Sequence, residues 1–306
     1  RGRYVKQLCR YCDTPSELTA CCVNELHLKK AHNIRRLIER SWNTNNPQGQ
    51  ANALQKLQDM SQHSVDLAFH HVRFGTHNNH GVHQACLIEM LHQVYLGIDK
   101  TTEEQFAKQV GEKSQAFVLL NSLACNIAKY LARQADRNIP KMSYTKGLQS
   151  AKCTGKEYEG VLLGELMILS CETGQQILST TKGKSGELKS PTVQVDWIHF
   201  LDQLLKFHAW MKLPTMLVSD VRKFERKLPE FMYFIKMVLR RSQGMGMRFV
   251  KFHALRHIPK DILNFGVPKV GDTSVNKEHW KPAKTASKQT QRNPKKFEEQ
   301  TSKRLI

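Results

Sequence analysis

Apolar residues recur at intervals of three and four along most of the chain, which is the spacing that places them on one face of an α-helix. The alternation of apolar and polar residues that is typical of strands is scarce, and it is clearest at the start of 247–258. Turn-forming residues interrupt the helical pattern at 43–50, 138–140 and 180–191. The pattern predicts helices over 26–42, 51–69, 86–98, 106–133, 158–178, 195–210, 217–224 and 231–241.

The chain divides into three parts by composition. Residues 1–83 combine a Cys-x-x-Cys knuckle with a basic helical pair, 84–241 form an all-α domain, and 242–306 hold a His-x-x-x-His segment and a basic C-terminal segment. We therefore expect a mainly α-helical fold in which the two ends of the chain meet beside the central helical domain.

Net charge narrows the range of functions. The 306 residues include 47 Lys plus Arg against 27 Asp plus Glu, so the formal net charge is +20 and the pI is near 9.7. Such an excess argues against an ordinary near-neutral enzyme that acts on small neutral substrates. Because Lys and Arg neutralise phosphates, the expected partner is nucleic acid, and no small-molecule substrate is expected.

The apolar stretches and the cysteines indicate the compartment. The longest apolar stretches, such as 161–163 and 117–120, are far shorter than the ~20 residues of a membrane span, so no membrane partner is expected. Eight unevenly spaced cysteines do not resemble a secreted disulfide framework, and no apolar signal segment opens the chain. We expect a reducing compartment, nuclear or cytoplasmic, and not secretion.

Two basic runs occupy the C-terminal part of the chain. Seven basic residues and no acidic residue lie in 236–260, and ten basic and four acidic residues lie in 269–306. A basic run is commonly a solvated face, but two runs that flank a histidine pair favour a groove for a polyanion. The candidate nucleic-acid-binding residues are Arg240, Arg241, Arg248, Lys251, Arg256, Lys281, Lys284, Arg292 and Lys295.

A possible metal site is split between the two ends of the chain. Cys9 and Cys12 form a Cys-x-x-Cys pair, which supplies half of a tetrahedral zinc site. His253 and His257 are four residues apart and share one face of a helix, which suits the other half. Spacing alone leaves two interpretations open: a Cys2His2 zinc site, or two packed thiols and two surface histidines.

A second group, Cys86, Glu89 and His92, follows three-residue steps and could line one helical face. That arrangement invites a metal or acid–base role, but we interpret Cys86 and His92 as packing residues and Glu89 as solvated. No P-loop, Rossmann glycine pattern, G-x-S-x-G or H-E-x-x-H motif occurs in the sequence, which disfavours those enzyme classes.

Four segments of the sequence resemble eukaryotic DNA-transposon proteins, most closely the Plavaka and Kyakuja-Dileera-Zisupton-like transposases. They are GRYVKQLCRYC (2–12), AFHHVRFGTHNNHGVHQACLIEMLHQVYLGI (68–98), KFHALRHIPKDILNFG (251–266) and DTSVNKEHWKPAKTASKQTQRNPKKFEEQTSKRL (272–305). The resemblance implies an RNase H-like core that is interrupted by a large helical insertion. Short remnants of that core would then lie at the two ends of this chain.

The same resemblance assigns roles to individual residues. It joins Cys9 and Cys12 with His253 and His257 in one structural zinc site, and it places a last catalytic acid at Glu278, where the local match is poor. The other two acids of a DDE-type site would lie before Arg1. Two-metal catalysis with Mg²⁺ needs all three carboxylates, so we expect this fragment to be inactive whatever its parent does.

Together these observations predict a transposase-derived DNA-binding fragment with a structural zinc site. The parent reaction would be DNA strand cleavage and transfer. The competing hypothesis is a non-enzymatic α-helical interaction module whose basic charge only aids solubility. The oligomeric state stays open, and a homo-oligomer is one alternative.

Overall fold

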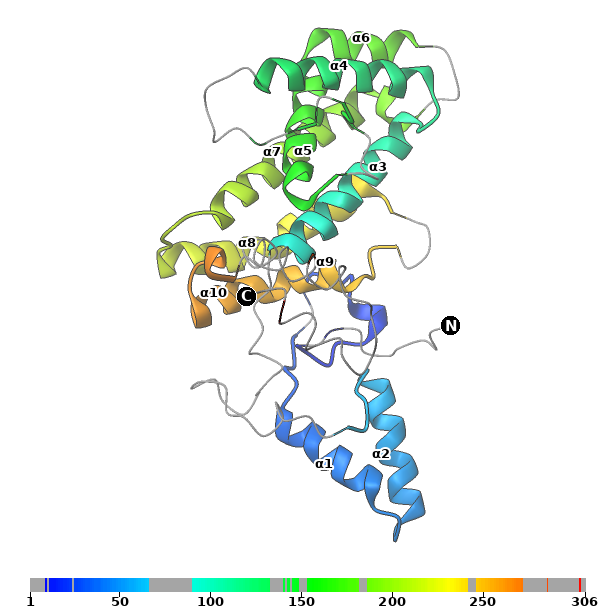
Figure 1. Cartoon of the computed structure of the whole chain (residues 1–306), viewed down its shortest axis with the longest axis vertical. Coiled ribbons are helices and arrows are strands. Elements are labelled where there is room, and N and C mark those ends of the chain that lie inside the picture. Colours follow the sequence, from blue (N-terminus) through cyan, green and yellow to red (C-terminus); the bar gives the residue numbers. More distant parts are fainter. Residues whose placement is uncertain are drawn as a thin grey trace.

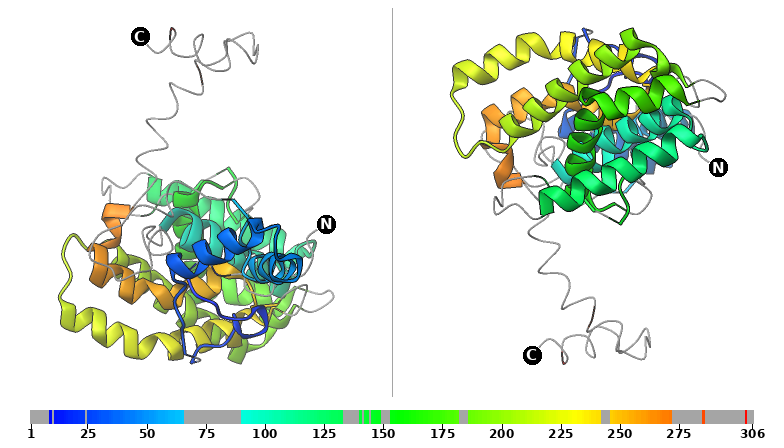
Figure 2. Two further views of the ribbon diagram at one scale, coloured as in Figure 1. Left: turned by 90° about the horizontal axis from the view of Figure 1, so that it is seen from below. Right: turned by 90° about the horizontal axis from the view of Figure 1, so that it is seen from above.

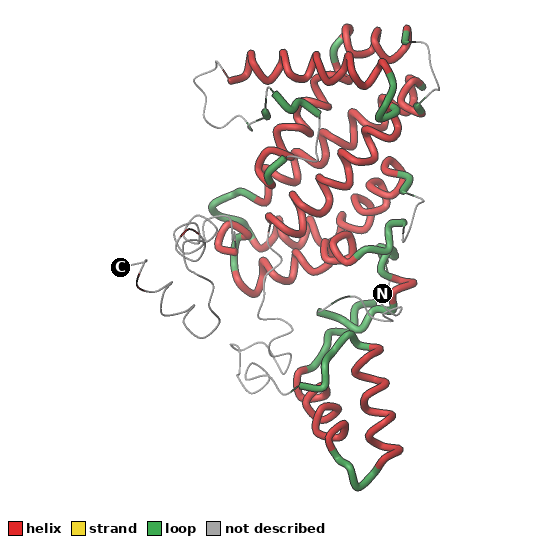
Figure 3. Tube along the Cα trace, turned by 45° about the vertical axis from the view of Figure 1, so that its right-hand side comes forward, coloured by secondary structure: helices red, strands yellow, loops and turns green. Residues whose placement is uncertain are grey.

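Most of the chain that the structure describes is helical. The computed structural model describes residues 9, 11–23, 25–65, 90–132, 140, 142–143, 145–148, 153–181, 186–241, 246–271, 285 and 303. Within these ranges the regular elements are helices, apart from one isolated antiparallel β-bridge between Cys12 and Leu28 (Figure 3). The mainly α-helical prediction is therefore confirmed.

The helices fall into an N-terminal pair and a larger body. The N-terminal part contains η1 (Ser16–Leu18), α1 (Ala31–Trp42) and α2 (Pro47–Asp59). The body contains the π-helix η4 (Met90–Asp99), α3 (Lys100–Val110), α4 (Gln115–Ala132), α5 (Gly155–Ser170), α6 (Glu172–Thr180), η6 (Glu187–Lys189), α7 (Pro191–Met211), α8 (Val218–Leu239), α9 (Val250–Ala254), η7 (Leu255–His257), α10 (Ile258–Phe265) and η8 (Pro268–Gly271).

The long axis of the molecule separates these two parts. Helices α4 and α6 lie at one end, α1 and α2 lie at the other, and α8, α9 and α10 lie between them (Figure 1). A view from the end that carries α1 and α2 shows this pair in front of the body (Figure 2, left). The N-terminal pair therefore projects from the helical body along the long axis.

Several helix boundaries differ from the pattern-based prediction. The predicted helix 106–133 is split into α3 and α4 at Gly111, whose φ of 97° is a backbone conformation that favours glycine. The predicted helix 158–178 is split into α5 and α6 at Cys171, whose backbone is extended. Conversely, α8 continues through Pro229, where a break was predicted, because buried apolar residues on both sides of the proline hold one helix against the body.

Local sequence explains why two of the helices begin where they do. The Asn46 side chain accepts a hydrogen bond from the Gly49 backbone N–H at 2.9 Å, and Pro47 fits the first turn of α2. Thr154 and Glu157 form a capping box at the start of α5, in which the Thr154 N–H donates to the Glu157 carboxylate at 2.6 Å.

Helix α7 lies at the centre of the main core. Its Trp197, Phe200 and Leu204 are fully buried, and Phe200 meets the Trp197 ring edge-on at a centroid distance of 5.8 Å. The Trp197 indole N–H donates to the Gln109 amide oxygen of α3 at 2.8 Å, and the Gln109 amide donates to the Val238 carbonyl of α8 at 3.1 Å. These bonds tie three helices around one polar pair inside an apolar core.

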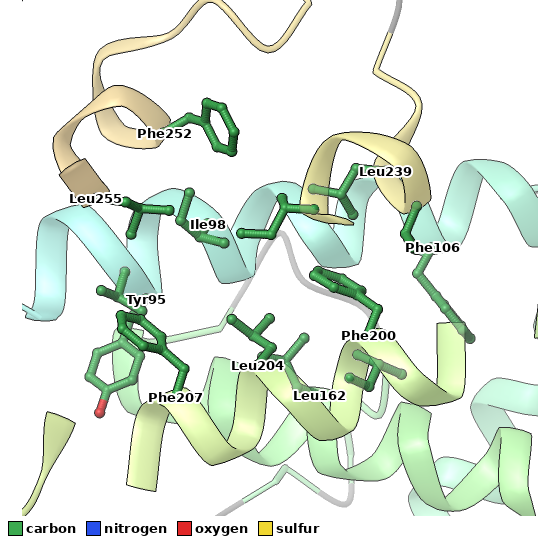
Figure 4. Packing of buried hydrophobic residues seen from close by; sticks show 14 of the residues in the cluster. Tyr95, Ile98, Phe106, Leu162, Phe200, Leu204, Phe207, Leu239, Phe252 and Leu255 are labelled. Atoms are coloured by element: carbon green, nitrogen blue, oxygen red, sulfur yellow. The ribbon is translucent and has the colours of Figure 1, made fainter. Parts of the chain in front are cut away.

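The C-terminal helices share this core. Figure 4 shows Phe252 and Leu255, from the α9–η7 segment, on the same apolar cluster as Ile98 of η4 and Leu204 and Phe207 of α7. The chain after residue 246 is therefore packed into the body, and this packing fixes the position of the histidine pair.

Ionisable groups are also buried inside the body. The His208 ring Nε2 lies 3.0 Å from the Asp99 carboxylate, and both side chains are fully buried. Glu159 lies 4.0 Å from the other ring nitrogen of His208 and pairs on its far side with Lys212. Burial raises the pKa of Asp99, while His208 opposes that rise by its charge and hydrogen bond.

Glu165 of α5 is the most isolated of these acids. It is fully buried, and neither carboxylate oxygen has a hydrogen-bond partner among the described residues. Burial raises its pKa well above the usual value, and the nearby Glu103 and Asp99 carboxylates raise it further. Glu165 is therefore held in its neutral form well above the pH at which it would ionise in the unfolded chain.

Glu165→Gln should stabilise the protein progressively as the pH rises. In the unfolded chain Glu165 ionises at its ordinary pKa of ~4.3, whereas in the folded chain it stays neutral to a higher pH. Between these two pKa values the free energy of unfolding of the wild type therefore decreases as the pH rises. Glutamine does not ionise, so the variant lacks this pH dependence. In urea unfolding from pH 4 to pH 8, the free energy of unfolding of the variant minus that of the wild type should increase with pH.

Glu157→Gln is the matched control on the same helix. Although burial opposes it, hydrogen bonds from the Thr154 backbone and side chain, together with Lys146, lower the pKa of Glu157. Its charge therefore contributes stability above the unfolded-state pKa, and the variant should lose stability relative to wild type over the same pH range. Parallel pH profiles for wild type and Glu165→Gln would contradict the assignment.

Candidate metal centre

Four side chains from the two ends of the chain converge at one point. Cys9 and Cys12 lie on the N-terminal segment that precedes η1, and His253 and His257 lie in α9 and η7. One sulfur or ring nitrogen from each lies within 4.8 Å of all the others, and all four side chains are buried. The structure thus brings together the residues that the sequence predicted as ligands.

The individual distances suit a four-coordinate ion. The Cys9 sulfur lies 3.5 Å from His257 Nε2, and the Cys12 sulfur lies 3.1 Å from His253 Nε2. A tetrahedral zinc with bonds of about 2.3 Å to sulfur and 2.0 Å to nitrogen places such atoms about 3.5 Å apart. Two sulfurs and two imidazole nitrogens form a donor set that zinc prefers, so this group can hold a metal ion such as zinc.

Protonation states in the cluster also favour a metal. Burial lowers the pKa of His257, which keeps its imidazole in the neutral form that a metal ligand requires. The pKa of Cys12 is lowered by a hydrogen bond from Cys9 and by both imidazoles, whereas the pKa of Cys9 is raised by Cys12 and by burial. The cluster stabilises one thiolate by itself, and a cation would stabilise the second.

Contacts with the body hold the histidine pair in place. The Lys251 ammonium donates to the Leu96 carbonyl of η4 at 2.5 Å, and Phe252 and Leu255 on either side of His253 are buried. A Cβ atom at Gly97 would lie 2.9 Å from the Lys251 side chain, so glycine permits this close approach of α9 to η4. The role of Gly97 could not be predicted from the sequence, because its neighbour Lys251 is known only once η4 and α9 are packed together.

The cysteine pair is held by backbone pairing with residues 27–29. The Asp13 N–H donates to the His27 carbonyl at 3.0 Å, and the Lys29 N–H donates to the Tyr11 carbonyl at 2.9 Å. The Tyr11 N–H also donates to the Cys9 sulfur at 3.4 Å, and the Tyr11 ring lies 5.0 Å from the His257 ring. This pairing explains why residues 26–30, which were predicted to be helical, lie outside the helix α1.

Lys29 supports the cysteine segment in a way that the sequence did not reveal. Its side chain is buried, and its ammonium donates to the Cys9 carbonyl at 2.6 Å and to the Met60 carbonyl at 3.1 Å. Burial lowers the pKa of Lys29, while the Cys9 and Cys12 sulfurs raise it. Within the sequence Lys29 was indistinguishable from the solvated lysines and arginines of the run around it.

The predicted nucleic-acid-binding residues have different surroundings. Arg240 is exposed but pairs with Glu187 at 3.2 Å, and the Arg241 guanidinium lies 5.0 Å from the centre of the Phe249 ring. Arg248 is exposed at the start of the α9 segment.

Two more of these residues lie closer to the metal centre. Arg256 is half-buried, and burial lowers its pKa while the sulfurs of Cys21, Cys12 and Cys22 raise it. The Lys251 ammonium donates a hydrogen bond to the Leu96 carbonyl, as described above. The other candidates, Glu278, Lys281, Lys284, Arg292 and Lys295, lie outside the described residues.

The second predicted group is only partly described. His92 lies on η4 and is exposed, while Cys86 and Glu89 lie outside the described residues. Among the residues that the structure does describe, Cys9, Cys12, His253 and His257 form the one group of His, Cys and acidic side chains arranged to hold a metal.

Two hollows of about 570 and 410 Å³ lie along the α7–α8 pair, away from the metal centre. Lys227 lines both, and aromatic side chains such as Phe234 and Trp210 line one each. Leu217 and Tyr233 also line these hollows and are exposed, and such exposed apolar side chains are what the competing interaction-module hypothesis requires.

Comparison with known proteins adds no assignment: no family model matches this chain, and no curated protein or solved structure is significantly similar to it. Of the helices described, none has the length and hydrophobicity that crossing a membrane would require. No disulfide joins the cysteines within the described ranges.

Purified protein should contain about one equivalent of zinc, and Cys12→Ser and His257→Ala should each lose most of it. Three remaining ligands hold zinc far more weakly than four, and structural sites are almost always four-coordinate. Elemental analysis after extensive dialysis measures the content. Cys171→Ser and His199→Ala are matched controls outside the cluster and should keep the metal, whereas equal zinc in all variants would exclude the site.

Removal of the metal should loosen the two ends of the chain and spare the centre of the body. The N-terminal segment is joined to α9 and η7 through the four ligands, whereas α5 and α7 pack directly on each other in the main core. Hydrogen exchange with and without a chelator should therefore show faster exchange in 9–29 and 250–258 and little change in α5 and α7. Uniform acceleration over the whole chain would contradict this division.

Proposed function

We propose that this chain is a nucleic-acid-binding module whose two ends are joined by a structural zinc ion. The observation that carries the proposal is the convergence of Cys9, Cys12, His253 and His257 in a protein of net charge +20. The Cys2His2 set would join the two ends of the chain through one ion, and the positive charge favours nucleic acid as the partner.

A structural role suits this site better than a catalytic one. Catalytic zinc sites have three protein ligands and an open position for water or substrate, whereas four protein ligands complete a tetrahedron. Cys9, Cys12 and His253 are at most 1% exposed and His257 is 4% exposed, so substrate has no route to the ion in this arrangement. The metal would hold the chain together and take no part in a reaction.

Basic residues of the C-terminal part support a polyanion as the partner. Arg240 and Arg248 are exposed, and Arg256 is half-buried beside the cysteines. Arginine presents a planar set of donors that matches phosphate oxygens, so even a side chain that is paired at rest can exchange its partner for a phosphate. We place the protein in the nucleus or cytoplasm, where nucleic acid is present and thiols stay reduced.

The resemblance to DNA-transposon proteins gives this proposal a more specific form. In it, the helical body corresponds to an insertion domain, and the two terminal parts are remnants of an RNase H-like core joined by zinc. DNA is then the natural ligand, and strand cleavage and transfer with Mg²⁺ belongs to a longer parent protein. Glu278 would supply at most one carboxylate, which is too few for two-metal catalysis.

Binding to a DNA duplex should weaken steeply with salt. Each phosphate that the protein neutralises contributes a slope of about −0.9 to log Kobs against log salt, so ~4 contacts give a slope near −4. Fluorescence anisotropy with a labelled duplex of unrelated sequence, measured between 50 and 200 mM salt, tests this expectation.

The same titration separates the two classes of function. An interaction module that binds a protein through the apolar hollows of α7 and α8 should not bind DNA at ~50 mM salt, where phosphate contacts are strong. Absence of binding to both duplex and single-stranded DNA at that salt concentration would end the nucleic-acid proposal.

A further inference from the structure

Helices α1 and α2 form a separate small unit. Ile34 and Ile38 of α1 pack against Leu57 of α2 in a cluster of their own, apart from the main core. The turn of residues 43–46 joins the two helices, and the pair projects at the end of the long axis opposite α4 and α6 (Figures 1 and 3). Its outer faces are therefore available to a partner.

The outer face of α1 is strongly cationic. Residues 30–42 contain Lys30, Arg35, Arg36 and Arg40 against a single acid, Glu39. Glu39 lies 3.9 Å from Arg35, and no ion pair within the described ranges involves Arg36 or Arg40, which are both exposed. These two arginines sit four residues apart on the face opposite Ile34 and Ile38, about 6 Å from each other along the axis.

The exposed face of α2 differs in kind. The side of α2 turned away from α1 carries the amides Gln48, Asn52 and Gln55, and hydrogen bonds along the helix join Gln48 to Asn52 and Gln55 to Asp59. Charge is thus concentrated on one side of the hairpin. A role in solubility alone would not require such asymmetry, whereas docking on a polyanion from one side does.

We propose that the outer face of α1, centred on Arg36 and Arg40, binds the phosphate backbone of a nucleic-acid duplex. The ~6 Å between the two arginines approaches the ~7 Å rise of two phosphate steps along one strand. This proposal rests on the nucleic-acid-binding function proposed above, and it assigns phosphate contacts to a surface separate from the basic residues beside the metal centre.

The base of the hairpin is fixed to the metal centre, which orients this face. Lys29, one residue before Lys30, bonds to the carbonyls of Cys9 and Met60, and so joins the start of α1 and the end of α2 to the cysteine segment. The position of the α1 face is therefore tied to the segment that carries Cys9 and Cys12.

The test is the double variant Arg36→Gln/Arg40→Gln in the full chain. Two lost phosphate contacts should reduce the salt slope of duplex binding by about 2, and the loss of affinity between 50 and 200 mM salt should become about tenfold smaller than in wild type. Arg222→Gln/Arg226→Gln on α8 removes the same charge from another exposed helix and should leave the slope unchanged.

Each result has a defined meaning. If wild type binds DNA and the α1 variant has the wild-type salt slope, this proposal is wrong and the nucleic-acid function stands. If the salt slope decreases equally in both double variants, the decrease reflects net charge alone and the proposal is also wrong. Failure of wild type to bind any nucleic acid would overturn the proposed function itself. Circular dichroism and zinc content verify folding, and parallel titrations with DNA and RNA duplexes show which phosphate source is preferred.

Discussion

The meeting of Cys9 and Cys12 with His253 and His257 is the constraint on which the arrangement of the two chain ends depends. Cys12 and His253 are 241 residues apart in sequence. In a chain-entropy treatment of cross-links, closing a loop of that length lowers the conformational entropy of the unfolded state, which destabilises that state by about 5 kcal/mol. This is comparable to the whole stability of many domains, so one ion would have a large effect on the N-terminal part.

The helical body depends on this constraint much less. Trp197, Phe200 and Leu204 are buried in a core formed mainly by α3, α5, α7 and α8, and the α9–η7 segment adds Phe252 and Leu255 to it. The histidine pair is therefore presented on a preformed surface. The cysteine segment, by contrast, has few buried apolar residues of its own and relies on the bridge to Leu28 and on Lys29.

The sequence predicted what local patterns can determine. Three- and four-residue periodicity located most of the helices, and the two spaced pairs identified the four residues that can hold a metal ion. The breaks at Gly111 and Cys171 escaped prediction because periodicity continues across them, and α8 passed Pro229 because tertiary packing outweighs one missing hydrogen bond. Lys29, Gly97 and the Asp99–His208 pair acquire their roles only from distant partners, which no local pattern encodes.

The distance in sequence between the two pairs of ligands also sets the order of events during synthesis. A ribosome that adds 5 to 20 residues per second needs on the order of 10 to 50 s to pass from Cys12 to His253. Helices η4 to α8 are translated within this interval and can form before His253 is made, because helix formation is much faster than translation. The Cys9 and Cys12 thiols therefore remain without their imidazole partners until His253 and His257 have been translated.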